Sequence, residues 1–166
     1  MNAGAYGREI ADVLISSTYV DFEGTIKTIS KDDHNFSYRH SFYSENTDCI
    51  IISAKFQLKE DLKENIKQTI QDCKTKRIDK QPLEYPSGGS TFKRPDGHFA
   101  GKLIEDAGLK GYTVGGAMVS EKHAGFIINH NHATCIDILT LIEVIKNRVF
   151  EKNGVDLECE IRIIGE

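Results

Sequence analysis

The sequence predicts an α+β fold, in which helices and strands follow one another along 166 residues. Short apolar stretches separated by turn residues fill the first third of the chain, and such stretches are typical of strands. Two later segments repeat apolar residues at the helical period, and strands are predicted beyond each of them. Because no predicted strand runs into a glycine-rich dinucleotide fingerprint, we expect α+β packing rather than a doubly wound sheet.

The first half is predicted to hold strands and then one long helix. Strands are expected at 11–16, 18–22 and 25–30, with a Glu-Gly turn at 23–24. The segment "DCIIISAKFQL" (48–58) predicts a strong strand that is buried at its start and alternates at its end. The next segment predicts an amphipathic helix exposed on one side, with apolar positions at Leu62, Ile66, Ile70 and Cys73.

Composition changes near residues 76–80, where proline, glycine and serine replace the helical pattern. This change predicts a domain boundary. Beyond it, "FAGKLIEDAG" (99–108) fits a short helix closed by its last glycine. The segments "YTVGGAMVS" (112–120) and "AGFIIN" (124–129) are typical of two strands.

A second long helix is predicted to begin at Thr134, because Asp137 three residues later completes a capping pattern. It is predicted to end before Gly154, and a last strand, "LECEIRIIG" (157–165), follows. The apolar face of the helix comprises Ile138, Leu141, Ile142, Ile145 and Val149.

Alternation along the last predicted strand places Glu158, Glu160 and Arg162 on one face. One interpretation is a solvated face with a surface ion pair. The other is a carboxylate and a guanidinium that point into a cleft, where the arginine keeps Glu160 ionised or binds an anionic substrate. Spacing alone leaves both interpretations open.

Composition indicates a soluble, cytoplasmic protein. The chain is 39% hydrophobic and 28% charged, with a net charge of −4, which disfavours general nucleic-acid binding. No apolar run reaches the ~18 residues of a membrane helix, so no membrane partner is expected. The four cysteines form no Cys-x-x-Cys pair, which favours reduced thiols. His130 and His132 lack a third ligand at sensible spacing, so we expect an exposed loop and no metal site.

The residue pattern of the segment "YPSGGSTFKRPDG" (85–97) is typical of neither a helix nor a strand. Its two glycines permit backbone angles closed to other residues and the close approach of a ligand, and Lys93 and Arg94 follow them. Ser90 could give a proton to a strongly basic carbanion where water is excluded. The alternative is a glycine-rich hairpin turn with a solvated serine, and the residues alone do not decide between them.

Tyr38 and Arg39 form a second candidate. A lone Tyr-Arg pair is usually a stacking contact at a sheet edge, and arginine is also well suited to bidentate carboxylate recognition. His123 is expected to have a structural role, closing a turn or bonding a carbonyl.

Taken together, four motifs resemble a known family. They are "NAGAYG" (2–7), "YRHS" (38–41), "LECEIRIIGE" (157–166) and the long block "QPLEYPSGGSTFKRPDGHFAGKLIEDAGLKGYTVGGAMVSEKHAGFIIN" (81–129). In this order they are similar to the C-terminal part of the UDP-N-acetylenolpyruvoylglucosamine reductases, also called UDP-N-acetylmuramate dehydrogenases. The "GSTFKRP" form resembles the shorter of the family's two architectural types.

The resemblance implies a reaction and roles for residues. NADPH reduces a bound FAD, and hydride then passes to the enolpyruvyl group of a UDP-sugar in peptidoglycan precursor synthesis. By resemblance, Ser90 donates the proton, while Arg39 and Glu160 stabilise the charge that develops on the substrate carboxylate. Further residues are implied in binding: Tyr38, Lys93, Arg94 and Arg162 for the substrate, and Asn2, Ala3, Gly4 and Ala5 for the edge of the flavin.

The resemblance also implies that the N-terminal flavin-binding half of the family is absent from this chain. Residues 1–77 would then be the end of an FAD-binding domain, and residues 78–166 a UDP-sugar-binding domain. We expect this part alone not to retain FAD, and we expect it to associate with the missing half or with itself through exposed apolar surface. The alternative is a UDP-sugar-binding or structural module without redox activity.

Overall fold

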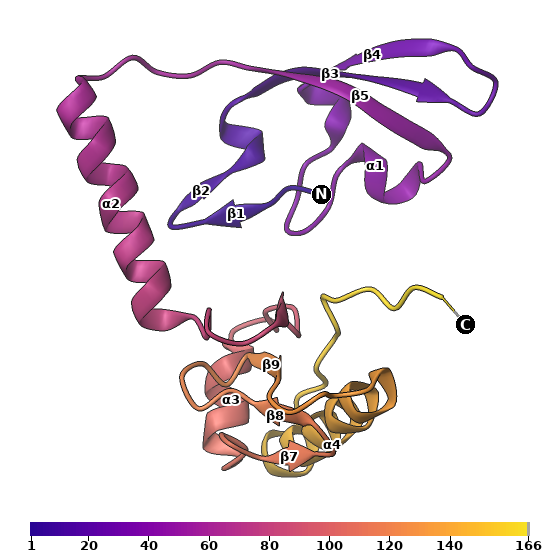
Figure 1. Cartoon of the computed structure of the whole chain (residues 1–166). Coiled ribbons are helices and arrows are strands. Elements are labelled where there is room, and N and C mark those ends of the chain that lie inside the picture. The colour runs from indigo at the N-terminus through magenta and orange to yellow at the C-terminus, as the bar shows by residue number, and fades with distance from the viewer. Residues whose placement is uncertain (166) are drawn as a thin grey trace. The chain divides into compact units, whose positions relative to one another are not determined.

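The computed structural model describes residues 1–165 and shows two compact units, divided between Cys73 and Lys74. The division falls a few residues before the boundary expected after residue 77, inside a continuous helix. Each unit combines a sheet with helical segments (Figure 1), and the predicted α+β class is confirmed. That residues 1–77 and 78–166 belong to flavin-binding and substrate-binding domains stays a prediction.

The first unit contains a three-stranded antiparallel sheet in the order β4-β3-β5. The strands predicted at 11–16 and 18–22 are a single strand, since Ser17 between them is buried and continues the ladder. The elements are β1 (Gly4–Ala5), β2 (Arg8–Glu9), a 3-10 turn (Ile10–Asp12), β3 (Leu14–Asp21), β4 (Ile26–Ser30), a second 3-10 turn (Asp32–His34), α1 (Phe42–Glu45) and β5 (Cys49–Phe56).

Strand β5 forms as predicted, but its burial differs. Ile50, Ile51 and Ile52 are 69%, 52% and 54% exposed, so the prediction that the strand is buried at its start is wrong. The strand is an edge of the sheet, paired only with β3. A continuous apolar run is typical of a buried strand, whereas in residues 1–165 nothing covers these side chains.

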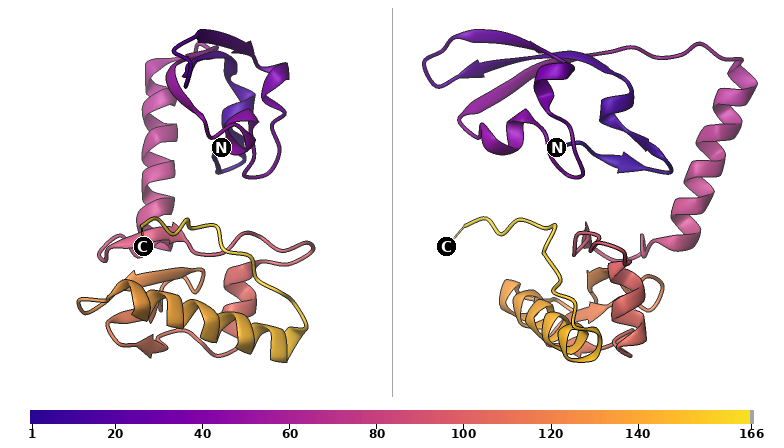
Figure 2. Two further views of the ribbon diagram at one scale, coloured as in Figure 1. Left: turned by 90° about the vertical axis from the view of Figure 1, so that its right-hand side faces the viewer. Right: turned by 180° about the vertical axis from the view of Figure 1, so that it is seen from behind.

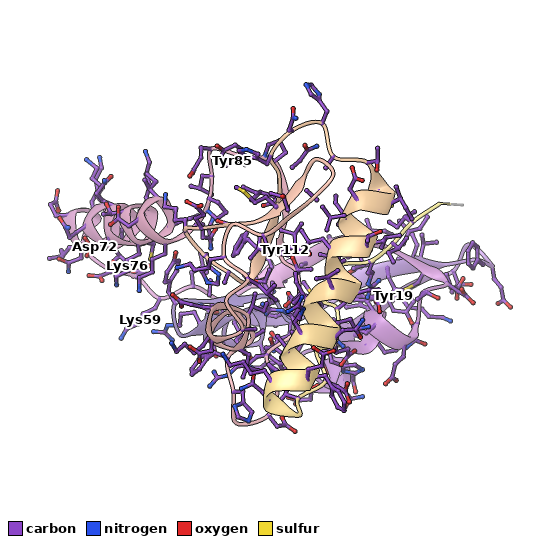
Figure 3. The ribbon with its side chains drawn as sticks, turned by 90° about the horizontal axis from the view of Figure 1, so that it is seen from below. Tyr19, Lys59, Asp72, Lys76, Tyr85 and Tyr112 are labelled. Atoms are coloured by element: carbon purple, nitrogen blue, oxygen red, sulfur yellow. The ribbon has the colours of Figure 1, made fainter. Side chains whose placement is uncertain are left out.

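Helix α2 (Lys63–Lys80) also forms where its periodicity predicts. Its apolar side is not covered, because Ile66 and Ile70 are exposed and only Cys73 is half-buried. The prediction that only one side is exposed is therefore wrong for the described part of the chain. On the polar side, Asp72 and Lys76 extend away from the helix (Figure 3).

The second unit contains a four-stranded antiparallel sheet in the order β6-β9-β8-β7. Helix α4 packs on β7, β8 and α3 (Figure 2). The predicted strand at 112–120 is instead a hairpin, because Gly115 and Gly116 form the turn between two short strands. The elements are β6 (Ser87–Ser90), α3 (Ala100–Asp106), β7 (Thr113–Val114), β8 (Ala117–Val119), β9 (Phe126–Asn129) and α4 (Cys135–Asn153).

Helix α4 confirms its prediction closely. Its N-cap Thr134 accepts a hydrogen bond from the Asp137 N–H at 3.2 Å, and the Asp137 carboxylate accepts one from the Thr134 N–H at 2.9 Å. Such a cap stabilises a helix by about 1 kcal/mol. The Asp137 carboxylate accepts hydrogen bonds from the backbone N–H groups of Thr134 and Gly116 and from the Thr134 side chain, and these bonds lower the pKa of the carboxyl. Among the described helices, none is long and apolar enough to cross a lipid bilayer.

The core of the second unit lies between α4, α3 and the sheet. Its residues without solvent exposure include Ile104, Val119, Leu141, Ile145 and Val149. Each fully buried aliphatic side chain of this kind stabilises the fold by roughly 1.5–3 kcal/mol. Phe92, two residues after Ser90, belongs to the same core and anchors that segment.

The last predicted strand, 157–165, is wrong as a continuous element. Only Cys159 forms a bridge, opposite Phe92, and Leu157 is buried beside it. Two backbone bonds flank this bridge, from the Lys93 N–H to the Glu158 carbonyl and from the Glu160 N–H to the Thr91 carbonyl. Cys159 and Ile161 still pack against the core, whereas Ile163 and Ile164 are 67% and 92% exposed.

Candidate active site

Ser90 ends strand β6 at an irregularity of the sheet. Ser87 lies opposite Ile128 of β9 and Ser90 opposite Phe126, so β6 takes three steps while β9 takes two. Gly89 absorbs the extra residue with a φ of +84°, a conformation that glycine adopts without strain. This is a β-bulge, a device that redirects a side chain at the edge of a ladder. The glycines are thus part of the sheet rather than of the hairpin turn considered as an alternative, and Ser90 is half-buried rather than solvated.

The segment that carries Glu160 lies directly beside the segment that follows Ser90. The Glu160 N–H donates to the Thr91 carbonyl at 2.8 Å, and the Lys93 N–H donates to the Glu158 carbonyl at 2.8 Å. The structure therefore brings the neighbourhoods of Ser90 and Glu160 together in the second unit. Glu160 itself is half-buried, which differs from the fully solvated interpretation of that face.

The four predicted substrate-binding residues have different contacts, and three of them lie in the second unit. The Lys93 ammonium forms an ion pair with the Glu158 carboxylate. The Arg94 guanidinium lies over the Phe99 ring, 4.1 Å from its centroid, as in a cation–π contact. Arg162 lines a hollow of about 410 Å³ together with Ser87, Gly88, Thr91 and Ile161, among other residues. Tyr38 lies in the first unit.

A second hollow, of about 430 Å³, lies within the first unit. Gly4 and Ala5 line it, and so do Tyr38 and Arg39. The Arg39 guanidinium is 5.2 Å from the centroid of the Tyr38 ring, which is the stacking contact expected for this pair. Arg39 has a φ of +56°, a left-handed conformation that is strained for a side chain of its size.

This hollow fits part of an anionic cofactor. Gly4 and Ala5 present backbone with little side-chain bulk, and Arg8 and Arg39 add two guanidinium groups that suit phosphate oxygens. Glu9 and Asp12 also line the hollow and bring negative charge. The residues present would therefore hold one edge of such a group rather than enclose it.

Asn2 has a different setting from its three neighbours. It is 2% exposed, and its amide donates to the Glu9 carboxylate at 2.8 Å and accepts from the Ala11 N–H at 3.0 Å. Ala3 is exposed, and its carbonyl accepts from the Ile10 N–H at 3.0 Å. The Asn2 side chain thus orders the glycine-containing segment from inside.

Two residues of this region, Thr91 and Glu158, have contacts that their sequence context did not predict. Thr91 is 3% exposed and hydrogen-bonded through its backbone and its side chain. The two glycines before Ser90 could have indicated Thr91, because paired glycines in a strand are typical of a β-bulge. A bulge leaves an N–H group of the neighbouring strand without its ladder acceptor, and a nearby hydroxyl can replace that acceptor. Glu158 carried no such signal, because its partner Lys93 is 65 positions away.

Known proteins are similar to this chain across the segment that contains Ser90 and Glu160. The family model "UDP-N-acetylenolpyruvoylglucosamine reductase, C-terminal domain" matches residues 81–164. The reductase of that name from Agathobacter rectalis is 53% identical over all 166 residues, which are 52% of its length. The one from Clostridium botulinum strain Okra is 52% identical over the whole chain, which is 54% of its length.

A solved structure is also similar. The crystal structure of the UDP-N-acetylenolpyruvylglucosamine reductase of Thermus caldophilus matches with a TM-score of 0.80 and 34% identity, over 96% of this chain and 57% of that one. The chain thus spans about half the length of the relatives that it matches. With the match across 81–164, the chain belongs to the UDP-N-acetylenolpyruvoylglucosamine reductase family and corresponds to its C-terminal part.

Proposed function

We propose that this chain supplies the proton-donating and substrate-binding part of an NADPH- and FAD-dependent reductase. The substrate would be UDP-N-acetylglucosamine enolpyruvate and the product UDP-N-acetylmuramate, a step of peptidoglycan synthesis in the cytoplasm. The observation that carries this proposal is the direct pairing of the segments of Ser90 and Glu160, within the residues that match the family model.

Ser90 is the proposed proton donor. A serine hydroxyl is a weak acid, so it serves only an acceptor as basic as the carbanion left when hydride adds to the enolpyruvyl double bond. The bulge at Gly89 sets the direction of the hydroxyl, and the buried neighbours Thr91 and Phe92 hold the strand in place. The hydride and this proton together saturate the double bond.

Arg39 and Glu160 are proposed to act on the charge of the substrate carboxylate. Negative charge spreads into this carboxylate after hydride addition, and a fixed guanidinium stabilises it. The strained backbone at Arg39 supports such a role, because strain of this kind is retained where a side chain must be aimed. Glu160, held by its backbone bond to Thr91, would polarise the same region.

The remaining cations and Tyr38 are proposed to bind the UDP-sugar. Arg162 lines the hollow beside β6, which supports a proposed contact with the pyrophosphate. Lys93 and Arg94 precede the Pro95 turn and are proposed to add positive charge for the same anionic groups, with Lys93 now paired to Glu158 and Arg94 lying over Phe99. Tyr38, exposed beside Arg39, offers an aromatic surface to the substrate.

FAD, when bound, would supply the hydride and be reduced by NADPH. Gly4 and Ala5, with Ala3 beside them, are the proposed contacts of this chain along the flavin edge. Asn2 would act indirectly, since its amide is bonded to Glu9 and Ala11. The partial enclosure by these residues supports the expectation that this chain alone does not retain FAD.

The N-terminal portion carried by the relatives is the proposed partner. The exposed apolar side chains of Ile50, Ile51, Ile66 and Ile70 offer a surface for another polypeptide. A second copy of the chain is the alternative occupant. Sedimentation of the chain with and without that portion distinguishes the two.

One alternative function has a specific observation in its favour. The hollow lined by Arg162 and Gly88 lies entirely within the second unit, so a UDP-sugar could bind without any redox chemistry. A visible spectrum after incubation with FAD separates the hypotheses for the chain as given. A colourless protein that binds the UDP-sugar and does not oxidise NADPH favours the binding module.

The decisive experiment uses the chain joined to the N-terminal portion of the Agathobacter rectalis relative. We expect Ser90→Ala to slow substrate reduction by about 10²–10⁴-fold, the usual contribution of a positioned proton donor. Flavin reduction by NADPH should remain near normal, because it does not use this proton. Equal loss of both half-reactions would contradict the role of Ser90.

A further inference from the structure

The bulge at Gly89 leaves a backbone group of the neighbouring strand to be satisfied. On β9, Ile127 stands between Phe126 and Ile128, whose partners on β6 are Ser90 and Ser87. No regular ladder partner faces Ile127 across this interruption. Its N–H instead donates to the hydroxyl of Thr91 at 3.1 Å, in a buried setting.

Thr91 makes two further bonds through its backbone. Its N–H donates to the Gly125 carbonyl at 2.9 Å, and its carbonyl accepts from the Glu160 N–H at 2.8 Å. The residue is 3% exposed, so all three bonds are shielded from water. A single residue thus joins the strand of Ser90 to β9 on one side and to the segment of Glu160 on the other.

The turn that receives the Thr91 N–H is itself fixed. The His123 ring accepts from the Gly125 N–H at 3.1 Å, which confirms its predicted part in a turn. The buried Ser120 hydroxyl accepts from the N–H groups of Lys122 and His123, each at 3.2 Å. The Gly125 carbonyl is therefore a rigid acceptor, and Thr91 transmits its position to Ser90.

We propose that Thr91 is a positioning residue for the reaction proposed above: its buried hydroxyl closes the bulge and fixes Ser90 relative to Glu160. This inference rests on the proposed function of those two residues. The hydroxyl is required because a methyl group in its place would leave the Ile127 N–H buried without an acceptor, which costs more than a lost bond in water. Thr91 also lines the hollow beside β6, but it is only 3% exposed and its hydroxyl is bonded to the Ile127 N–H.

The structural part is tested on the chain as given. Thr91→Val keeps the side-chain shape and removes the acceptor, whereas Thr91→Ser keeps the acceptor. We expect amide exchange at Ile127 to accelerate about 10-fold in Thr91→Val relative to exchange at the core residue Val149, and to stay near wild type in Thr91→Ser. Thr140→Val is the matched control, because the Thr140 hydroxyl bonds only within its exposed helix turn. An unchanged Ile127-to-Val149 ratio in Thr91→Val would overturn the proposal.

The functional part uses the joined protein described above. Thr91→Val should slow substrate reduction on the order of 100-fold, as small misplacements of catalytic groups do, while flavin reduction by NADPH stays unchanged. Thr91→Ser should recover most of the rate. If Thr91→Val reduces substrate at the wild-type rate while Ser90→Ala does not, the positioning role is wrong and the proposed function stands. If Ser90→Ala leaves substrate reduction intact, the proposed function is wrong, and amide exchange still decides whether Thr91 closes the bulge.

Discussion

Replacing Gly89 with alanine tests whether the bulge sets the direction of Ser90. Gly89 has a φ of +84°, and an added Cβ would meet no heavy atom within 4 Å. The perturbation is therefore conformational and not steric. Gly97, with a φ of +71° and equally open surroundings, is the matched control in the turn beyond Pro95.

The magnitude follows from two opposing effects. A residue with a Cβ pays about 1–2 kcal/mol in a left-handed conformation. The same substitution restricts the unfolded chain, which returns about 0.4–1 kcal/mol. We expect Gly89→Ala and Gly97→Ala each to lower the free energy of unfolding of the second unit by roughly 0.5–1 kcal/mol.

The two variants should differ in function. Urea unfolding, followed through resonances of core residues such as Val119 and Ile145, measures the loss of stability. Single-turnover substrate reduction in the joined protein measures the direction of Ser90, and we expect only Gly89→Ala to be slow. A Gly89→Ala protein as stable as wild type would refute the left-handed bulge. Equal slowing by Gly97→Ala would refute its link to Ser90.

Three further predictions concern other parts of the chain. Ile145→Ala, in the core, should lower the free energy of unfolding by about 2–5 kcal/mol, whereas Ile136→Ala on the exposed side of the same helix should cost under about 0.5 kcal/mol in the same urea assay. Burial lowers the pKa of His34 below 6.5, so that as the pH falls the unfolded state binds a proton before the folded state does. The free energy of unfolding of the first unit should therefore be highest above pH 6.5 and decrease below it by at most about 1.4 kcal/mol per pH unit. In urea unfolding at several pH values, His34→Gln should remove this decrease. Glu158→Gln releases the Lys93 ammonium from its exposed ion pair, so it should change the free energy of unfolding by less than about 1 kcal/mol. The same variant should bind the UDP-sugar more tightly in calorimetry at low salt. An unchanged affinity would contradict the role of Lys93.

Local signals predicted the parts of the fold that depend on neighbouring residues. Helix α4 follows from its capping pair and its apolar period, both of which lie within a few residues of the structure they specify. The ends of β7 and β8 were harder to predict, because the paired glycines at 115–116 could lie within one strand or form a turn between two. The two glycines are compatible with a turn, but whether a turn forms there depends on how the neighbouring strands pair.

Burial could not be predicted in the same way. Ile50 and Ile66 have apolar patterns typical of covered faces, yet covering depends on what packs there, and in residues 1–165 nothing does. The candidate site was similarly limited. Residue patterns raised Ser90 and Glu160 as candidates, and only the resemblance assigned their roles. Their pairing through Thr91 required the sheet register, which joins segments far apart in the sequence.

The pairing beside Ser90 also bears on how the second unit folds. The Lys93–Glu158 contact closes a separation of 65 positions, whereas each turn of α4 closes only four. Contacts between distant segments form late, after local helices and hairpins have reduced the entropy that remains to be lost. Mutations in the 91–93 and 158–160 ladder should therefore accelerate unfolding far more than they slow refolding. We therefore expect the geometry on which the proposed chemistry depends to assemble last in the unit and to come apart first.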